Sequence, residues 1–213
     1  MKLYSYYRSS AAYRVRIMLN LKKIDYEIES INLVQGDQRS NSYTGINPQG
    51  LVPSLELDDG RIITQSMAIC EWIEANYDTP KLIPDDSFQA ARVRACALVV
   101  AADIHPVNNL RILNYLENEL GVDAPEKNNW YRHWVEQGFQ AIEKTLPGTT
   151  FCFADEPGLA DAFLVPQVFN ALRFEVDMEP YPKISAVNET CNEIQAFIDA
   201  HPDNQADNPS LAS

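Results

Sequence analysis

The hydrophobic pattern of this chain changes in character near residue 77, and that change limits the fold more than any other feature. Residues 1 to about 77 alternate between short strand patterns and helical patterns. From residue 87 on, no convincing strand pattern occurs, and apolar residues recur at helical spacing. The 213 residues suffice for one large domain or two small ones. We therefore expect an α/β domain over residues 1–80 and an all-α domain over residues 87–213.

The first part is expected to form a small mixed sheet with helices packed on it, because a parallel strand–helix–strand unit is followed by a hairpin. The strand at residues 26–31 alternates apolar and polar side chains, as a half-buried strand does. Gly60 suits the positive φ of the hairpin turn. The predicted order is a strand over residues 3–6, a helix over 14–21, a strand over 26–31, an irregular or helical piece, a hairpin over 54–64 and a helix over 66–76.

The second part is predicted to be helical throughout. A linker with prolines and aspartates, residues 77–86, separates it from the first part. The polar tail after Pro202 is expected to be loose. Helices are predicted over residues 89–119 with a break at Pro106, and over 129–146, 159–172 and 185–200.

Composition excludes several classes of function. With 17 basic and 30 acidic residues, the formal net charge of -13 argues against sequence-independent binding to nucleic acid or to an anionic membrane. No apolar run approaches the ~18 residues that a membrane helix needs. Residues 1–8 turn polar too early for a signal peptide. We expect a soluble, cytoplasmic protein with no nucleic-acid, membrane or metal partner.

The cysteine pattern agrees with a reducing compartment. None of the four cysteines forms a CxxC pair or a metal-binding spacing, and three lie in apolar, helix-like runs. Buried free thiols are therefore expected at Cys70, Cys96, Cys152 and Cys191.

The segment between the first strand and the first helix is the first candidate for a site. Ser9 and Ser10 stand where the helix would begin, and either hydroxyl can simply cap it, which is worth ~1 kcal/mol. The same helix end also stabilises an anion, such as a thiolate, through its amides and dipole. The sequence leaves both interpretations open.

Two further segments likewise allow both a structural and a functional interpretation. Pro53 either starts an edge strand, since it lacks an amide hydrogen, or forms a cis peptide that lets the Val52 backbone bind an extended peptide ligand. Ser66, which follows Gln65 at the start of the next helix, either only caps that helix or caps it while binding a ligand carboxylate.

The order and spacing of these segments resemble the glutathione transferase superfamily, and within it the zeta class, over nearly the whole chain. The segments that carry the resemblance are Tyr4-Ser5-Tyr6-Tyr7-Arg8-Ser9-Ser10, Tyr13-Arg14-Val15-Arg16-Ile17, Asn47-Pro48, Leu51-Val52-Pro53, Gln65-Ser66, Leu164-Val165-Pro166-Gln167, Arg173-Phe174 with Val176-Asp177, and Pro180-Tyr181-Pro182. The resemblance implies a thioredoxin-like first domain, an all-α second domain and a homodimer.

It also implies glutathione as cofactor and assigns roles to residues. Stabilisation of the thiolate falls to Ser9, with Ser10 in support. Recognition of the tripeptide falls to Gln49, Val52, Pro53, Gln65 and Ser66, while His105 and Asn109 either have a structural role or contact glutathione. The implied reaction is a cis–trans isomerisation of an unsaturated dicarboxylic keto acid in aromatic catabolism, and the cations expected to bind its carboxylates are Arg8, Arg111 and Arg173. Surface salt bridges are the alternative for these arginines.

Two positions depart from the family pattern. Ala11 stands where zeta enzymes often have a cysteine, which removes any thiol of the protein's own there and argues against glutaredoxin-like chemistry. Gly158 stands where a serine or threonine usually caps a helix, three residues before Asp161. Glycine caps nearly as well, so we expect the local structure to survive.

Three hypotheses about function follow. The leading one is a maleylacetoacetate or maleylpyruvate isomerase that regenerates its glutathione. The second is a general transferase that consumes glutathione on small electrophiles or α-halo acids. The third is a non-catalytic binding module with the same fold, and the intact Ser9, Val52-Pro53 and Gln65-Ser66 argue against it.

Overall fold

The computed structural model describes residues 1–211, which form two compact units. One unit contains Met1–Lys81 and the segment from Asn192 onward, and the other contains Leu82–Cys191. The predicted division into residues 1–80 and 87–213 differs from these units at its C-terminal end. There, helix α9 (Gln195–Ala200) packs on helix α1 (Ser10–Leu21) of the first unit.

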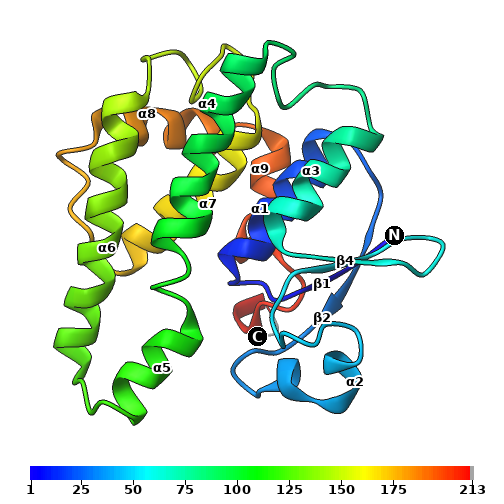
Figure 1. The fold of residues 1–213 in the computed structure, drawn as a ribbon, viewed down its shortest axis with the longest axis vertical. Helices are drawn as coiled ribbons and strands as arrows, with labels where there is room; N and C mark the ends of the chain where they lie inside the picture. Colours follow the sequence, from blue (N-terminus) through cyan, green and yellow to red (C-terminus); the bar gives the residue numbers. More distant parts are fainter. Residues whose placement is uncertain (212–213) are drawn as a thin grey trace. The chain divides into compact units, whose positions relative to one another are not determined.

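The first unit has a four-stranded mixed sheet, in agreement with the expected fold class (Figure 1). Its strand order is β2-β1-β3-β4, with β1 parallel to β2 and antiparallel to β3. The remaining elements of the unit are β1 (Lys2–Ser5), β2 (Glu27–Ser30), α2 (Asn41–Thr44), β3 (Ser54–Glu56), β4 (Ile62–Thr64), α3 (Ser66–Asn76) and the 3-10 turns Asp37–Arg39, Pro202–Asn204 and Pro209–Leu211. The predicted hairpin is therefore confirmed, with Gly60 at a φ of 83°.

Strand β2 corrects one expectation. All four of its residues are exposed, and Ile28 keeps 40 % of its surface accessible, so the predicted half-burial is wrong. The alternation of polar and apolar residues identified the strand correctly. It could not indicate that β2 lies at the edge of the sheet, where it has a neighbour on one side only.

The two faces of the sheet are covered differently (Figure 1). Side chains alternate between faces along a strand, so Leu3 and Tyr4 point to opposite sides. Leu3 is fully buried beside its register partner Leu55. Helices α1 and α3 pack together on one side of the sheet. Tyr4 belongs to a second cluster that includes Tyr43 of α2. Helix α1 is buried from Ser10 to Leu19, which fixes the position of its N-terminus.

The second unit is helical, as predicted. Its elements are α4 (Ser87–Leu98), a π-helical segment (Val99–Ile104), α5 (Leu110–Asn118), α6 (Ala124–Thr145), α7 (Leu159–Arg173) and α8 (Pro182–Cys191). The break predicted at Pro106 lies between the π-helical segment and α5. The single helix predicted over residues 185–200 is wrong, because the chain leaves the helix after Cys191 and starts α9 at Gln195.

The predicted loose tail is also wrong over its described part. Gln205 and Asn208 are 5 % and 6 % exposed, and the Gln205 side-chain amide donates to the carbonyls of Asp199 and His201 at 2.8 Å and 3.0 Å. These bonds tie the polar segment to the end of α9. Residues 212 and 213 of the predicted tail lie outside the described part of the chain.

The described residues hold neither a membrane-spanning helix nor a metal-binding cluster. Within residues 1–211, no helix has the length and apolar character needed to cross a bilayer. The same residues contain no cluster of three or more histidine, cysteine, aspartate or glutamate side chains arranged to hold a metal ion.

Candidate functional site

Ser9 is placed by a tight turn between β1 and α1. The Ser9 amide donates to the Tyr6 carbonyl at 2.9 Å, which closes the turn over residues 6–9. Ser9 is the N-cap of α1, and its hydroxyl oxygen accepts a hydrogen bond from the Ala12 amide at 3.3 Å. Because that bond uses the oxygen as an acceptor, the hydroxyl hydrogen stays available to a ligand. The structure therefore unites the two interpretations of this serine, since one hydroxyl can cap the helix and face an anion.

The two residues that follow Ser9 are less accessible. Ser10 and Ala11 are the first helical residues and are 4 % and 8 % exposed, whereas Ser9 is half-buried. Ser9 is thus the more accessible hydroxyl at the positive end of the helix dipole. This arrangement suits Ser9 to contact a bound anion directly and Ser10 to a supporting role at the same helix end.

The protein has no reactive thiol to offer at its described residues. All four cysteines are free and buried, as expected. Burial raises the pKa of the Cys70, Cys152 and Cys191 thiols above the ordinary value. A thiolate at the start of α1 must therefore come from a bound ligand.

Two arginines on α1, to which the sequence interpretation assigned no role, are buried and hydrogen-bonded. Arg14 and Arg16 are 1 % and 0 % exposed. The Arg14 guanidinium donates to the Ser66 hydroxyl oxygen at 3.2 Å, and the Arg16 guanidinium donates to the Tyr7 carbonyl at 3.0 Å. The sequence signal that could have identified them is the presence of two charges inside an apolar helical run. A charge that is buried in such a helix requires specific partners.

The segment before β3 shows the conformation that its functional interpretation requires. The Val52–Pro53 peptide bond is cis, and Val52 is 9 % exposed. The preceding carbonyl, of Leu51, accepts hydrogen bonds of 2.7 Å from the Tyr43 hydroxyl and from the Asn47 side-chain amide. These two bonds fix the backbone next to Val52.

Gln65 and Ser66 lie at the start of α3, and the expectation that Ser66 caps this helix, which both interpretations shared, is wrong. The N-cap residue is Gln65, whereas Ser66 is the first helical residue and is buried. Gln65 has a φ of 71°, a left-handed conformation that costs energy for a residue with a side chain. Its side-chain amide donates to the Gln49 side-chain oxygen at 2.7 Å. The structure thus brings two of the predicted glutathione contacts together.

Three other predicted site residues lie in the second unit, at the break between the π-helical segment and α5. The side chains of His105 and Asn109 are 3.4 Å apart, between the His105 Nε2 and the Asn109 Nδ2. Asn109 caps α5, since its side-chain oxygen accepts from the Arg111 amide at 3.1 Å. The Arg111 side chain is exposed. His105 and Asn109 are thus in contact, and Asn109 and Arg111 share the first turn of α5.

The remaining two arginines have aromatic neighbours. Arg173 ends α7, is exposed, and donates to the Asn170 side-chain oxygen at 3.1 Å while lying 5.8 Å and 5.6 Å from the ring centres of Phe169 and Phe174. Arg8, in the first unit, is exposed and lies 5.8 Å from the Tyr7 ring centre. Exposed guanidinium groups can bind carboxylates from solution.

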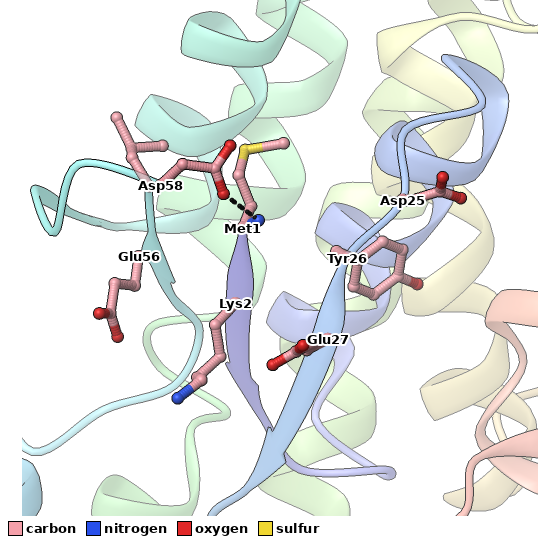
Figure 2. A pocket seen from close by; sticks show the side chains of 8 residues that line it. Met1, Lys2, Asp25, Tyr26, Glu27, Glu56 and Asp58 are labelled. Carbon is pink, nitrogen blue, oxygen red and sulfur yellow. Dashed lines mark hydrogen bonds and ion pairs between the residues drawn. The ribbon is translucent and has the colours of Figure 1, made fainter.

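A surface hollow of about 460 Å³ lies at the end of the sheet where β1 begins, away from Ser9, which follows the end of β1 (Figure 2). Its acidic lining does not suit an anionic ligand. Its lining includes the carboxylates of Asp25, Glu27, Glu56 and Asp58, where β1 and β2 begin and β3 ends. The Met1 amine is paired with Asp58 at 2.6 Å. None of the predicted site residues lines it.

Comparison with known proteins gives relatives over the full length of the chain. The family model for the glutathione S-transferase N-terminal domain matches residues 8–76. A probable maleylacetoacetate isomerase of Vibrio cholerae is 46% identical, over 96% of this chain and 97% of its own. The maleylacetoacetate isomerase of Pseudomonas aeruginosa is 44% identical, over 99% of this chain and 100% of its own.

Solved structures that resemble this chain carry the same enzyme names. The holo structure of maleyl pyruvate isomerase, a bacterial zeta-class glutathione S-transferase, has a TM-score of 0.95 and 44% identity, covering 97% of this chain and 99% of its own. A maleylacetoacetate isomerase of Methylobacterium extorquens AM1 with bound malonate and glutathione has a TM-score of 0.93 and 35% identity, covering 96% of this chain and 98% of its own.

Proposed function

This chain belongs to the glutathione S-transferase family, in its zeta class of maleylacetoacetate and maleylpyruvate isomerases, and on that premise we propose that it is a glutathione-dependent cis–trans isomerase. The substrate is an unsaturated dicarboxylic keto acid formed in aromatic catabolism. Relatives at similar identity carry both enzyme names, so the proposal covers maleylacetoacetate and maleylpyruvate.

The observation that carries the proposal is the position of Ser9 at the start of α1. A free thiol with a pKa of ~8.5 is only about 3% ionised at pH 7. Lowering that pKa by ~2 units requires ~2.7 kcal/mol. A hydroxyl that hydrogen-bonds to the charged sulfur contributes ~1.5–3 kcal/mol, and the helix terminus adds ~0.3–1 kcal/mol. Ser9 and α1 can thus ionise a bound thiol without a general base from the protein.

The residues around this helix end fit glutathione. The Val52 backbone, beside the cis proline, is suited to bind the peptide part in an extended conformation. Ser66 and the paired Gln49 and Gln65 are suited to the γ-glutamyl end, where the buried guanidinium of Arg14 adds positive charge. We assign His105 and Asn109 to a contact with the cofactor, supported by their position beside the π-helical segment, a feature common at functional sites.

The chemistry of the reaction needs both a nucleophile and cations. Glutathione, when bound, supplies a thiolate that adds reversibly to the double bond, so that the bond can rotate. Ser9 holds this sulfur in its ionised form. Arg8, Arg111 and Arg173 bind the substrate carboxylates through planar guanidinium groups and stabilise the negative charge that develops on the conjugated oxygens.

A glutathione-dependent absorbance assay with both cis acids tests this function. The trans product should form only when glutathione is present, and the total thiol should be unchanged at the end. Loss of thiol in proportion to product would instead identify a general transferase. Absence of glutathione binding in a thermal-shift titration would favour a non-catalytic module.

Two further properties belong to this proposal. A cytoplasmic location is supported by the four free, buried cysteines, which agree with a reducing compartment. A homodimer is supported by large apolar side chains that the single chain leaves exposed, among them Val34 at 71% and Phe88 at 68%. Sedimentation analysis tests the second property, and a monomer at micromolar concentration would contradict it.

A further inference from the structure

We propose that Asp207 and Arg16 are positioning residues that hold the turn presenting Ser9, so that the C-terminal segment sets the geometry of the thiolate site. This inference rests on the proposed function, since it concerns how the bound thiol becomes ionised. Both residues lie in the first unit, with Ser9.

The backbone of Tyr7 is held on both of its polar groups. The Tyr7 amide donates to the Asp207 Oδ2 at 2.9 Å, and the Tyr7 carbonyl accepts from the Arg16 Nη2 at 3.0 Å. Tyr7 lies inside the turn that the Ser9 amide closes on the Tyr6 carbonyl. Two charged side chains therefore fix the peptide groups two residues before the active hydroxyl.

Arg16 connects three parts of the first unit through one guanidinium group. Besides Tyr7, it donates to the Ser5 hydroxyl oxygen at 3.1 Å and to the Ala200 carbonyl at 3.0 Å. Arg16 is fully buried, and its planar geometry fixes the directions of these bonds. The end of β1, the turn and the end of α9 are thus held in one arrangement.

The segment that carries Asp207 is anchored to the first unit by burial and by hydrogen bonds of its own. Its Gln205 is buried and bonds to two carbonyls near the end of α9, Asp199 and His201. Pro202 and Asn208 are buried as well. A carboxylate 200 residues away in the sequence is thereby fixed at the Tyr7 amide.

The sign of the charge shows why this is a positioning role. A carboxylate near a thiolate raises the pKa of the thiol, so the charge of Asp207 alone would oppose ionisation. If charge were its main effect, removing it would help the enzyme. If its hydrogen bond holds the turn, removing it should impair ionisation, because a displacement of about 1 Å can cost up to ~100-fold in rate.

Three variants separate these effects. Asp207→Ala removes both the charge and the acceptor, whereas Asp207→Asn removes the charge and keeps an acceptor oxygen. Asp203→Asn is the matched control, since it makes the same charge change in the same segment at an exposed side chain. The measurements are the pH midpoint of thiolate absorbance of bound glutathione, kcat and KM, and amide hydrogen exchange of Tyr7 without ligand.

For Asp207→Ala we expect a higher thiol midpoint, a kcat reduced by about tenfold or more, an unchanged substrate KM and faster exchange at Tyr7. Asp203→Asn should stay near the wild-type protein in all four measurements. Asp207→Asn should match the wild type in kcat, KM and exchange, with a thiol midpoint equal to or slightly below that of the wild type, because it loses only the charge. An unchanged or lowered midpoint in Asp207→Ala would overturn the inference, as would equal loss in Asp207→Asn. A native protein that binds glutathione without ionising it would overturn the proposed function itself, and this inference with it.

Discussion

The side-chain amide of Gln65 donates a 2.7 Å hydrogen bond to the side-chain oxygen of Gln49, 16 residues earlier in the chain. Gln65, the N-cap residue of α3, has a left-handed backbone conformation, and Gln49 lies in the loop before the cis proline. The bond joins the two segments that we assign to glutathione and orients the carboxamides of both residues.

This pair should act as a unit in glutathione binding. Gln65→Ala and Gln49→Ala should each raise the glutathione Kd, and the double variant should lose less than the sum of the two. The expected coupling is ~0.5–1.5 kcal/mol, the usual contribution of a neutral hydrogen bond. Calorimetric titration of the four proteins provides the cycle, and strictly additive losses would show that the two side chains act independently.

Arg173→Ala should weaken the dicarboxylate substrate specifically. A charge-assisted hydrogen bond is worth ~1.5–3 kcal/mol, so the substrate KM should rise by about 10- to 100-fold while glutathione affinity changes little. Arg92→Ala is the control, because Arg92 also packs on an aromatic ring, that of Phe153, and has no assigned role. Equal loss of both ligands in Arg173→Ala would contradict the assignment.

In this chain, Gly158 packs so closely on the Leu82 backbone that a side chain would require a shift. A Cβ atom at this position would lie 2.7 Å from the Leu82 carbonyl oxygen. Gly158→Ala should therefore lower the free energy of unfolding by ~1–3 kcal/mol, the usual cost of overpacking. Gly45→Ala, whose Cβ would meet its nearest atom at 3.4 Å, should cost less than about 0.5 kcal/mol. Chemical denaturation measures both, and equal losses would refute the packing argument.

His201 should make stability depend on pH. Burial is the largest cause that lowers its pKa below 6.5, with Arg16 acting in the same direction and Asp203 against it. The unfolded chain therefore binds the proton more readily than the folded protein. The stability from the neutral ring is complete above about pH 6.5 and is lost as the pH falls through the folded-state pKa.

Denaturation at pH 7.5 and pH 5.5 tests this pH dependence. The wild-type protein should lose more stability over that range than His201→Gln. His133→Gln, in α6 of the second unit, shows whether the loss of any histidine has the same effect. An identical pH dependence in wild type and His201→Gln would remove His201 from the account.

The sequence predicted most of the fold because its signals were local. The mixed sheet, the hairpin at Gly60 and the start of α7 after Gly158 follow from hydrophobic period and turn chemistry, and the structure has all three. The positions of Ser9 and Ser66 at helix starts were predicted in the same way, although Gln65 is the N-cap of α3.

What the sequence could not predict depends on contacts between distant residues. Nothing local to the polar segment at 201–208 indicates that Gln205 is buried or that Asp207 reaches Tyr7. The exposure of β2 depends on its place at the sheet edge. The two buried arginines of α1 were visible as unusual residues, but their partners, Ser66 and Tyr7, become apparent only in three dimensions.

The most direct test of the account is a pH titration of the thiolate absorbance of bound glutathione, in the wild-type protein, Ser9→Ala and Ser9→Thr. In the wild type the midpoint should lie well below the ~8.5 of a free thiol. It should rise by about 1–2 units in Ser9→Ala, which loses a charge-assisted hydrogen bond, and stay near wild type in Ser9→Thr. If the pH midpoint of thiolate absorbance in Ser9→Ala equals that of the wild type, the central claim that this hydroxyl stabilises the thiolate is contradicted.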